Sequence, residues 1–362
     1  MGRATGSVRI GEPNLPEGKH MPSIRVRRTA LVTGLVAALA LTGCAPSGTQ
    51  PGQDEALVIY NAQHEQLTKE WTAAFTEETG IEVKLRHGDD SELANQLAQE
   101  GDASPADVFL TENSPAMSLV EDAGLFAPVD DATLQLVPHQ FRPSTGAWTG
   151  IAARDTVLVY NPDLISEDEL PDSILELQDP KWQGKWGAAP GGADFQAIVS
   201  AILASEGEKA TADWLAGMQS NAEIYRNNIV TMKAVNAGEV PMGIIYHYYW
   251  YRDQADTEEN SGNTALHLFE PGDPGAFVSI SGGGVLASSD HADKAQKFLA
   301  WLVGQKGQTI LGEGYSYEYP VAVGVPARSP LPALDSLGAP DIDPSTLNGP
   351  TVIDLMTEAG LL

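Results

Sequence analysis

The sequence is poor in cysteine and in basic residues. Its 362 residues include one cysteine, which excludes a disulfide framework and any multi-cysteine metal site. Lys and Arg number 21 against 49 Asp and Glu, so the formal net charge is −28. A general nucleic-acid-binding protein needs a basic face to replace phosphate counterions, so that class is excluded. The 42% of hydrophobic residues still describes a packed globular chain, long enough for about two domains.

Residues 1–43 are typical of a secretory signal peptide. Arg25, Arg27 and Arg28 precede an apolar run over residues 29–41. A basic segment followed by a short apolar run directs secretion, and this run is too short to span a bilayer as a helix. Residues 1–20 carry no such pattern, so both Met1 and Met21 are candidate start codons.

The single cysteine, Cys44, closes the segment LTGC, which resembles the bacterial lipobox whose cysteine is lipidated. Residues 44–55 are rich in Pro, Gly, Ser and Gln and predict a flexible tether. The mature domain is therefore expected on the outer face of the cytoplasmic membrane, held by a lipid anchor at Cys44. An ordinary signal peptide with an incidental cysteine is the alternative.

After the tether, short apolar strands alternate with helices. Strands are predicted over residues 57–60, 81–85 and 107–110, each followed by a segment of helical spacing. The first helix contains Leu67, Trp71 and Phe75 and is expected to end at Gly80, and the second is expected to be capped by Asp90 or Ser91. This order predicts a parallel sheet with crossover helices. A second α/β region begins near Val157, and the pattern returns to the first region near residues 277–280. Two lobes joined by crossing strands form a hinge, and ligands bind such sheets at the carboxyl ends of strands.

Three clusters follow predicted strands in this scheme. His64 follows the first strand, Glu112 the third, and the aromatic run 246–251 a strand of the second region. An imidazole, a carboxylate and two phenolates suit a hard cation, and their three negative charges balance a ferric ion. Adjacent residues in a strand point to opposite faces of the sheet. Tyr248 and Tyr249 can therefore bind one ion together only if the chain leaves the strand before them. Each residue alone also has an ordinary structural interpretation: a core or surface histidine, a solvated or capping glutamate, and packed or sugar-stacking aromatics.

The ordered set of motifs resembles the ferric-ion-binding proteins of bacterial iron ABC importers. The matching segments are YNAQH (60–64), PADVFLTE (105–112), Asn228, AVNAGEV (234–240), YYW (248–250), DPGA (273–276) and YP (319–320). The resemblance covers nearly all of residues 56–330. It implies an α/β, two-lobed periplasmic-binding-protein fold of type II, with two mixed sheets flanked by helices and joined by hinge strands. Residues 56–154 and 275–330 would form lobe 1, residues 155–274 lobe 2, and residues 331–362 a C-terminal extension.

The resemblance also implies the iron ligands, which fall on His64, Glu112, Tyr248 and Tyr249. The family completes the coordination sphere with water and a synergistic anion such as phosphate or carbonate. Tyr246 stands where the family has an asparagine, so it is a candidate ligand or neighbour of the ligands. His247, beside the tyrosine pair, is expected to be exposed or to lie next to the ligands.

The anion site departs from the family pattern. The turn that holds phosphate in the family contains a serine, whereas here residues 191–194 read GGAD. The backbone amides of Gly192 and Ala193 remain, but Asp194 is expected to repel an anion. Arg154 and Asn228 are kept. Tight phosphate binding is therefore not expected, and carbonate is expected over phosphate. Carbonate held by Arg154, water, and Tyr246 as a further ligand stay open for this position.

These observations predict a monomeric, lipid-anchored receptor that binds Fe(III) and delivers it to an ABC permease and its ATPase subunit. No hydrolase elbow and no zinc-protease motif is present in the sequence, so no catalysis is expected. The alternatives are a receptor of the same fold for an organic anion, a phosphonate or a sugar, and a lipoprotein enzyme or structural surface protein. The segment YSYEY (315–319) is expected either to line the cleft or to pack as aromatic core.

Overall fold

The computed structural model describes residues 56–362. The predicted signal peptide, lipobox, tether and start codon lie outside these described residues. Within residues 56–362, no helix combines the length and the apolar composition that a membrane crossing requires.

The described residues form ten strands, linked edge to edge. They are β1 (Leu57–Asn61), β2 (Val83–His87), β3 (Val108–Leu110), β4 (Phe126–Ala127), β5 (Thr149–Tyr160), β6 (Trp186–Ala188), β7 (Ala222–Ile224), β8 (Met242–Tyr246), β9 (Ala265–His267) and β10 (Val278–Leu286). Their order is β2-β1-β3-β10-β5-β8-β6-β7, with β4 on β10 and β9 on β5. β1 lies parallel to β2 and β3, and β6 lies parallel to β7 and β8. β5 and β10 run antiparallel to their neighbours.

The long strand β5 belongs to two sheets. Its residues 149–155 pair with β10 in the first sheet, and its residues 156–160 pair with β8 in the second. Each sheet mixes parallel and antiparallel pairs, and β5 crosses from one to the other. The predicted α/β fold with two mixed sheets and crossing strands is therefore confirmed. The lobe boundaries at 154/155 and 274/275 stay predictions.

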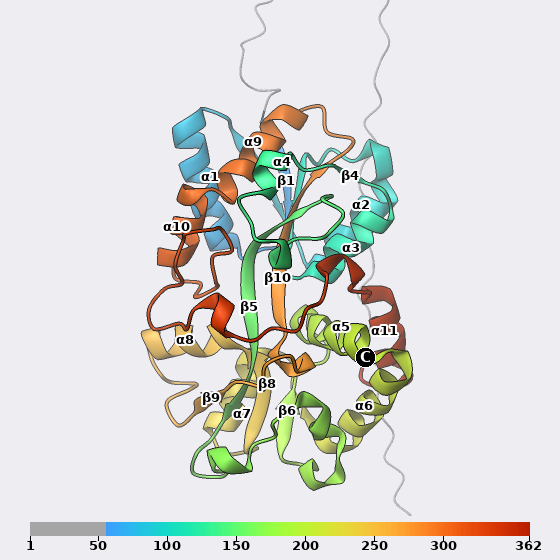
Figure 1. Cartoon of the computed structure of the whole chain (residues 1–362), viewed down its shortest axis with the longest axis vertical. Coiled ribbons are helices and arrows are strands. Elements are labelled where there is room, and N and C mark those ends of the chain that lie inside the picture. Colours follow the sequence, from blue (N-terminus) through green and yellow to red (C-terminus); the bar gives the residue numbers. More distant parts are fainter. Residues whose placement is uncertain (1–55) are drawn as a thin grey trace, which may run out of the picture. The chain divides into compact units, whose positions relative to one another are not determined.

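Helices cover both faces of each sheet. They are α1 (Glu65–Thr79), α2 (Asp90–Glu100), α3 (Ser114–Asp122), α4 (Asp131–Leu134), α5 (Ala193–Glu206), α6 (Glu208–Asn221), α7 (Asn228–Asn236), α8 (His247–Asp256), α9 (Ala292–Leu302), α10 (Gln305–Glu313) and α11 (Gly349–Glu358). In the first lobe α1, α9 and α10 lie together, and α2 and α3 lie on the opposite side of the strands (Figure 1). In the second lobe α7 and α8 form one group and α5 and α6 the other (Figure 1).

The apolar spacing of α1 explains its position. Leu67, Trp71 and Phe75 are fully buried on one side of the helix, and Phe75 meets Phe298 of α9 with ring centroids 5.1 Å apart. Gly80 ends the helix in the left-handed region, at a φ of 72° that strains any residue with a β-carbon. This end of the helix follows the sequence prediction.

The start of α2 differs from its predicted cap. The cap is expected at Asp90 or Ser91, whereas the cap position is Asp89 and Asp90 is the first helical residue. The Asp90 carboxylate is instead buried and accepts hydrogen bonds from the backbone N–H groups of Glu112, at 2.8 Å, and Asn113, at 3.0 Å. A distant segment therefore uses this carboxylate, which local sequence could not indicate.

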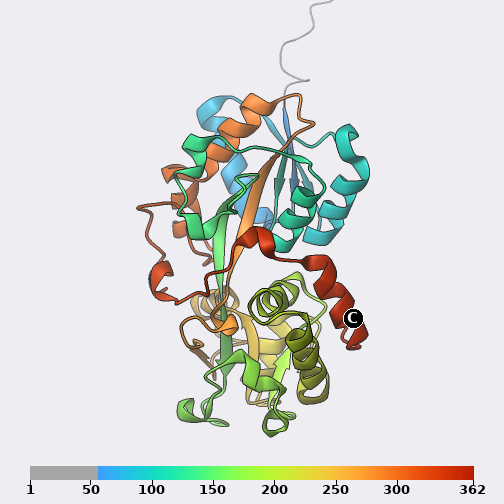
Figure 2. The same cartoon turned by 45° about the vertical axis from the view of Figure 1, so that its right-hand side comes forward.

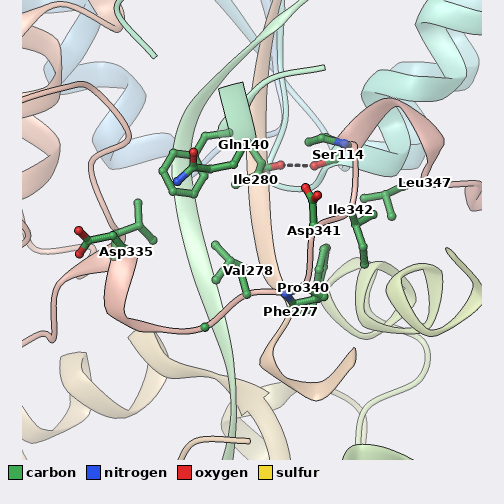
Figure 3. A pocket seen from close by; sticks show the side chains of 15 residues that line it. Ser114, Gln140, Phe277, Val278, Ile280, Asp335, Pro340, Asp341, Ile342 and Leu347 are labelled. Atoms are coloured by element: carbon green, nitrogen blue, oxygen red, sulfur yellow. Dashed lines mark hydrogen bonds between the residues drawn. The ribbon is translucent and has the colours of Figure 1, made fainter. Parts of the chain in front are cut away.

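The C-terminal segment 331–362 packs against both lobes. Its helix α11 contacts α3 of the first lobe and α5 and α6 of the second (Figure 2). Ser118 Oγ of α3 donates to the carbonyl of Pro344 at 3.1 Å. A cavity of about 210 Å³ lies between this segment and β10, where Val278 and Ile280 form part of its wall (Figure 3).

Candidate metal-binding site

The carboxyl ends of β1 and β3 bring His64 and Glu112 together. His64 is the cap residue of α1, three residues after the end of β1, and Glu112 lies two residues after the end of β3. The two strands that precede these residues are parallel neighbours, so their carboxyl ends lie at the same edge of the sheet. His64 Nδ1 lies 2.8 Å from Glu112 Oε1.

The two tyrosines reach this edge from the second lobe. β8 ends at Tyr246 and α8 begins at His247, so the chain leaves the strand before the tyrosine pair, as the metal hypothesis requires. The rings of Tyr248 and Tyr249 stack with centroids 4.1 Å apart. Tyr248 also meets His64 edge to face, with centroids 5.4 Å apart. The four predicted ligand residues therefore lie in one cluster between the lobes.

Several buried polar atoms of this cluster have no hydrogen-bond partner among the described residues. They include His64 Nε2, Tyr248 Oη and Glu318 Oε2. Glu318 Oε2 lies 3.9 Å from His64 Nε2. Buried polar atoms nearly always have a hydrogen-bond partner. Three such atoms without one, from three side chains of one cluster, therefore point to a bound ion or molecule that they would contact.

Burial and neighbouring charges shift the pKa values of His64 and Glu112 in opposite directions. Burial lowers the pKa of His64, but the charges of Glu318 and Glu112 outweigh it and hold the pKa above its usual value. Burial raises the pKa of Glu112, but the hydrogen bond from His64 and the charge of Arg154 together bring it below the usual value. Glu112 therefore presents a negative charge to the cluster at neutral pH.

The phenols of the cluster are neutral in the absence of a cation. Burial raises the pKa of Tyr248 and of Tyr249, and the charges of Asp194 and Glu112 raise both further. A ligand that binds the phenolate oxygens must therefore displace two protons. Among the described residues, no group of three His, Cys, Asp or Glu side chains could hold a metal, so a metal here depends on the tyrosines.

Arg154, a predicted anion holder, is bound to the protein itself. Its side chain is fully buried, and Nη1 donates to the carbonyl of Glu112. Nη2 donates to Glu318 Oε1 at 2.6 Å and to Gln63 Oε1 at 3.1 Å, which leaves Nε without a partner. The sequence analysis expects Arg154 to hold carbonate. Part of its guanidinium group is instead bound to the carboxylate of Glu318.

Asp194 occupies the centre of the predicted anion site. It accepts hydrogen bonds from Tyr249 Oη at 2.9 Å, from Asn228 Nδ2 at 2.7 Å and from Asn113 Nδ2 at 3.1 Å. The prediction that Asp194 acts only as a repelling charge is therefore too narrow. Because Asn113 belongs to the first lobe and Asp194 to α5 of the second, the carboxylate also connects the two lobes.

Gly192 of the predicted anion turn and the nearby Tyr246 also have partners within the protein. The Gly192 N–H donates to the carbonyl of Ala189 at 3.1 Å, within the turn that precedes α5. Ala193 is the first residue of that helix and lies beside Asp194. Tyr246 Oη lies within hydrogen-bond distance of two acceptors, Asn113 Oδ1 at 3.2 Å and the carbonyl oxygen of Asp194 at 3.1 Å, which share its single proton. Tyr246 thus stabilises the region around Asp194.

His247 is expected to be exposed or to lie next to the ligands. It is buried, so exposure is wrong, and its ring lies beside that of Tyr248 with centroids 6.2 Å apart. Its side chain is 1% exposed, and Nδ1 accepts a hydrogen bond from the Asp155 N–H at 3.0 Å. Nε2 donates to the carbonyl of Tyr317 at 2.8 Å. Burial lowers the pKa of His247 to about 3, so it stays neutral. It fixes α8 to β5 and to the segment 315–319.

The segment 315–319 both lines a cavity and reaches the cluster. Tyr315 and Tyr317 border a cavity of about 710 Å³ that also includes Tyr249, Arg252 and Arg328 in its wall. Sequence reasoning did not assign Glu318 of this segment to the site. The feature of the sequence that could have indicated its role is a single acidic residue between tyrosines, in a segment expected either to line the cleft or to form aromatic core.

Two lobes that share the strand β5 and enclose a cluster of metal-donor side chains are typical of bacterial solute-binding receptors. Residues 70–335 match the model of the family described as bacterial extracellular solute-binding protein, and the chain belongs to this family.

Relatives within the family are similar along nearly their whole length. The chain is 57% identical over 330 residues to the Fe(3+)-binding periplasmic protein of Serratia marcescens, covering 91% of this chain and 98% of the relative. It is 33% identical to the major ferric iron-binding protein of Neisseria meningitidis serogroup B, covering 89% and 95%. Among solved structures, iron-bound HitA from Pseudomonas aeruginosa has a TM-score of 0.78 and 39% identity, covering 84% of this chain and 99% of that chain. These relatives are binding proteins.

Proposed function

We propose that this chain binds ferric iron between its lobes and delivers it to an ABC permease and its ATPase subunit. The observation that carries the proposal is the cluster of buried donor atoms without partners, His64 Nε2 and Tyr248 Oη, beside Tyr249 and Glu112. The printed names of the Serratia and Neisseria relatives support the same cargo.

The proposed ligands are His64, Glu112, Tyr248 and Tyr249. Oxygen and imidazole donors suit a hard trivalent cation, and two phenolates with one carboxylate neutralise its three charges. Displacing protons from phenols of raised pKa requires a strongly charged ion, which favours Fe(III) over divalent metals. Carbonate near Arg154 and Asn228 stays a prediction. It would have to share these two residues with the carboxylates of Glu318 and Asp194, which already bind them.

In the proposed mechanism the tyrosines on α8 capture the ion first, because both come from one helix. Closure of the lobes then brings His64 and Glu112 onto it, and the closed surface is what the permease recognises. The protein carries out no catalysis in this scheme.

The test is to add ferric iron as a weak chelate to the mature domain and record the visible spectrum after gel filtration. A phenolate-to-iron charge-transfer band that elutes with the protein supports the proposal. Absence of both colour and retained iron contradicts it.

The second candidate is a receptor of the same fold for an organic anion, a phosphonate or a sugar. Arg252 and Arg328 in the wall of the 710 Å³ cavity are the observation in its favour. Both guanidinium groups lie over tyrosine rings, at 4.8 Å from the Tyr315 centroid and 4.5 Å from that of Tyr317. Calorimetric binding of a small organic anion by a protein that retains no iron would favour this candidate.

We further propose that the mature protein is a monomer anchored by lipid at Cys44 on the outer face of the cytoplasmic membrane. The lipobox-like segment and the tether-like residues 44–55 support this arrangement. Metabolic labelling with an alkyne fatty acid should mark the wild type and not Cys44→Ser. Labelling of both, or of neither, would contradict the anchor.

A further inference from the structure

Glu318 is a buried carboxylate whose two oxygens have different surroundings. Oε1 lies 2.6 Å from Arg154 Nη2 and accepts a hydrogen bond from Gln63 Nε2 at 3.3 Å. Oε2 is buried and has no hydrogen-bond partner among the described residues, although it lies at ion-pair distance from His64. The side chain is fully buried, so water does not solvate the second oxygen from outside. One oxygen is therefore fixed and the other is available.

The available oxygen faces the predicted metal donors. Oε2 lies 3.9 Å from His64 Nε2, which is also buried and has no hydrogen-bond partner among the described residues. Two atoms that bind one ion at about 2.1 Å each can lie no more than about 4.2 Å apart. The observed separation therefore allows both atoms to bind one ion.

The surroundings hold Glu318 in this orientation. Gln63 Oε1 accepts from Arg154 Nη2 at 3.1 Å and from the His64 N–H at 2.7 Å, so the amide links the arginine to the histidine backbone. The bridge between Ala153 of β5 and Tyr319 fixes the segment that carries Glu318. One oxygen of the Glu318 carboxylate therefore binds an arginine, and the other faces a predicted metal ligand, His64. A small anion bound beside a metal ion would have the same arrangement.

We propose that Glu318 is a ligand of the ferric ion, with Oε2 coordinating beside His64 Nε2 and Oε1 remaining on Arg154. The inference rests on the proposed function, because it concerns the same ion. The charges remain balanced: Arg154 offsets Glu318, and Glu112 with the two phenolates neutralises the ion.

The experiment compares Glu318→Gln with the wild type, using Glu313→Gln as the matched control because Glu313 is an exposed glutamate at the end of α10. Loss of an anionic ligand makes the iron a stronger electron acceptor, so the phenolate-to-iron band of Glu318→Gln should move to longer wavelength. Iron affinity should fall by more than about tenfold. The control should match the wild type in both measurements.

Glu318→Asp provides a second variant that keeps the negative charge near Arg154 and hence the fold. Its shorter side chain withdraws the free oxygen from the ion, so the band should again shift and affinity should fall. A purely structural Glu318 predicts an unshifted band in every variant that folds, and that result would overturn the proposal. If the wild type itself gives no coloured complex, the ferric function fails instead, which keeps the two failures distinct.

Discussion

The two lobes bring chemically different groups to the same cleft. The first lobe contributes His64 and Glu112, which lie at strand ends and contact each other at 2.8 Å. The second lobe contributes Tyr248 and Tyr249, neutral phenols stacked in the first turn of α8. The first pair is already ordered by its own contact, whereas the second gains its charge only when an ion displaces its protons. We therefore expect the second lobe to dominate affinity and the first to control release.

The largest effect should come from removing a phenolate. Tyr248→Phe and Tyr249→Phe should each weaken ferric binding by more than about 100-fold, beyond the range typical of groups outside the ligand set. Each should also weaken the visible band, and the double variant should abolish it. Tyr251→Phe on the same helix is the matched control and should keep both properties. Wild-type colour and affinity in the double variant would refute the tyrosine assignment.

The next effect is a dependence on pH that originates in the second lobe. Burial raises the pKa of both tyrosines, so each releases one proton when iron binds. Protons compete with the ion, and affinity should fall by about 100-fold for each pH unit lowered. Titration with a competing chelator across neutral and mildly acidic pH measures the slope. An affinity independent of pH would show that phenolates are not the ligands.

Changes in the first lobe should be smaller and kinetic. His64→Ala and Glu112→Gln should each weaken binding by about 10- to 100-fold, mainly through faster release, while the phenolate colour remains. Stopped-flow transfer of iron to a chelator measures the release rate. If these variants lost the colour as completely as the tyrosine variants, the proposed division between the lobes would be wrong.

The smallest expected effect concerns the contact that joins the lobes. Asn113 Nδ2 donates to Asp194 Oδ1 at 3.1 Å, and a hydrogen bond to a charged group contributes about 1.5–3 kcal/mol. Asn113→Ala should therefore favour the open form, which small-angle scattering of the iron-free protein would detect as a larger radius of gyration. Asn95→Ala, on α2 and exposed, is the control. An unchanged radius would show that the contacts of Asn113 with Asp194 and Tyr246 do not hold the lobes together.

Local patterns predicted much of the fold. The helical spacing of Leu67, Trp71 and Phe75 identified α1, and Gly80 identified its end. The requirement that the chain leave β8 before the tyrosine pair followed from strand geometry alone, and the start of α8 at His247 satisfies it. These features depend on neighbouring residues, which is why the sequence was sufficient.

Long-range contacts account for the predictions that differ. Asp90 resembles a helix cap, but its carboxylate binds the backbone after β3. His247 seemed free to face solvent beside the tyrosines, but β5 and the carbonyl of Tyr317 enclose it. Neither partner is near in the sequence, so no local pattern indicates the contact.

The sequence by itself determined the order of strands and helices and the donor types that follow the strands. These properties depend on spacing and on the chemistry of single side chains. Only the tertiary structure decided that Glu318 meets Arg154 and that Asp194 meets Asn228 and Asn113. The physical reason is that burial removes water as a partner, so each charged group must find its counterpart wherever the fold places one.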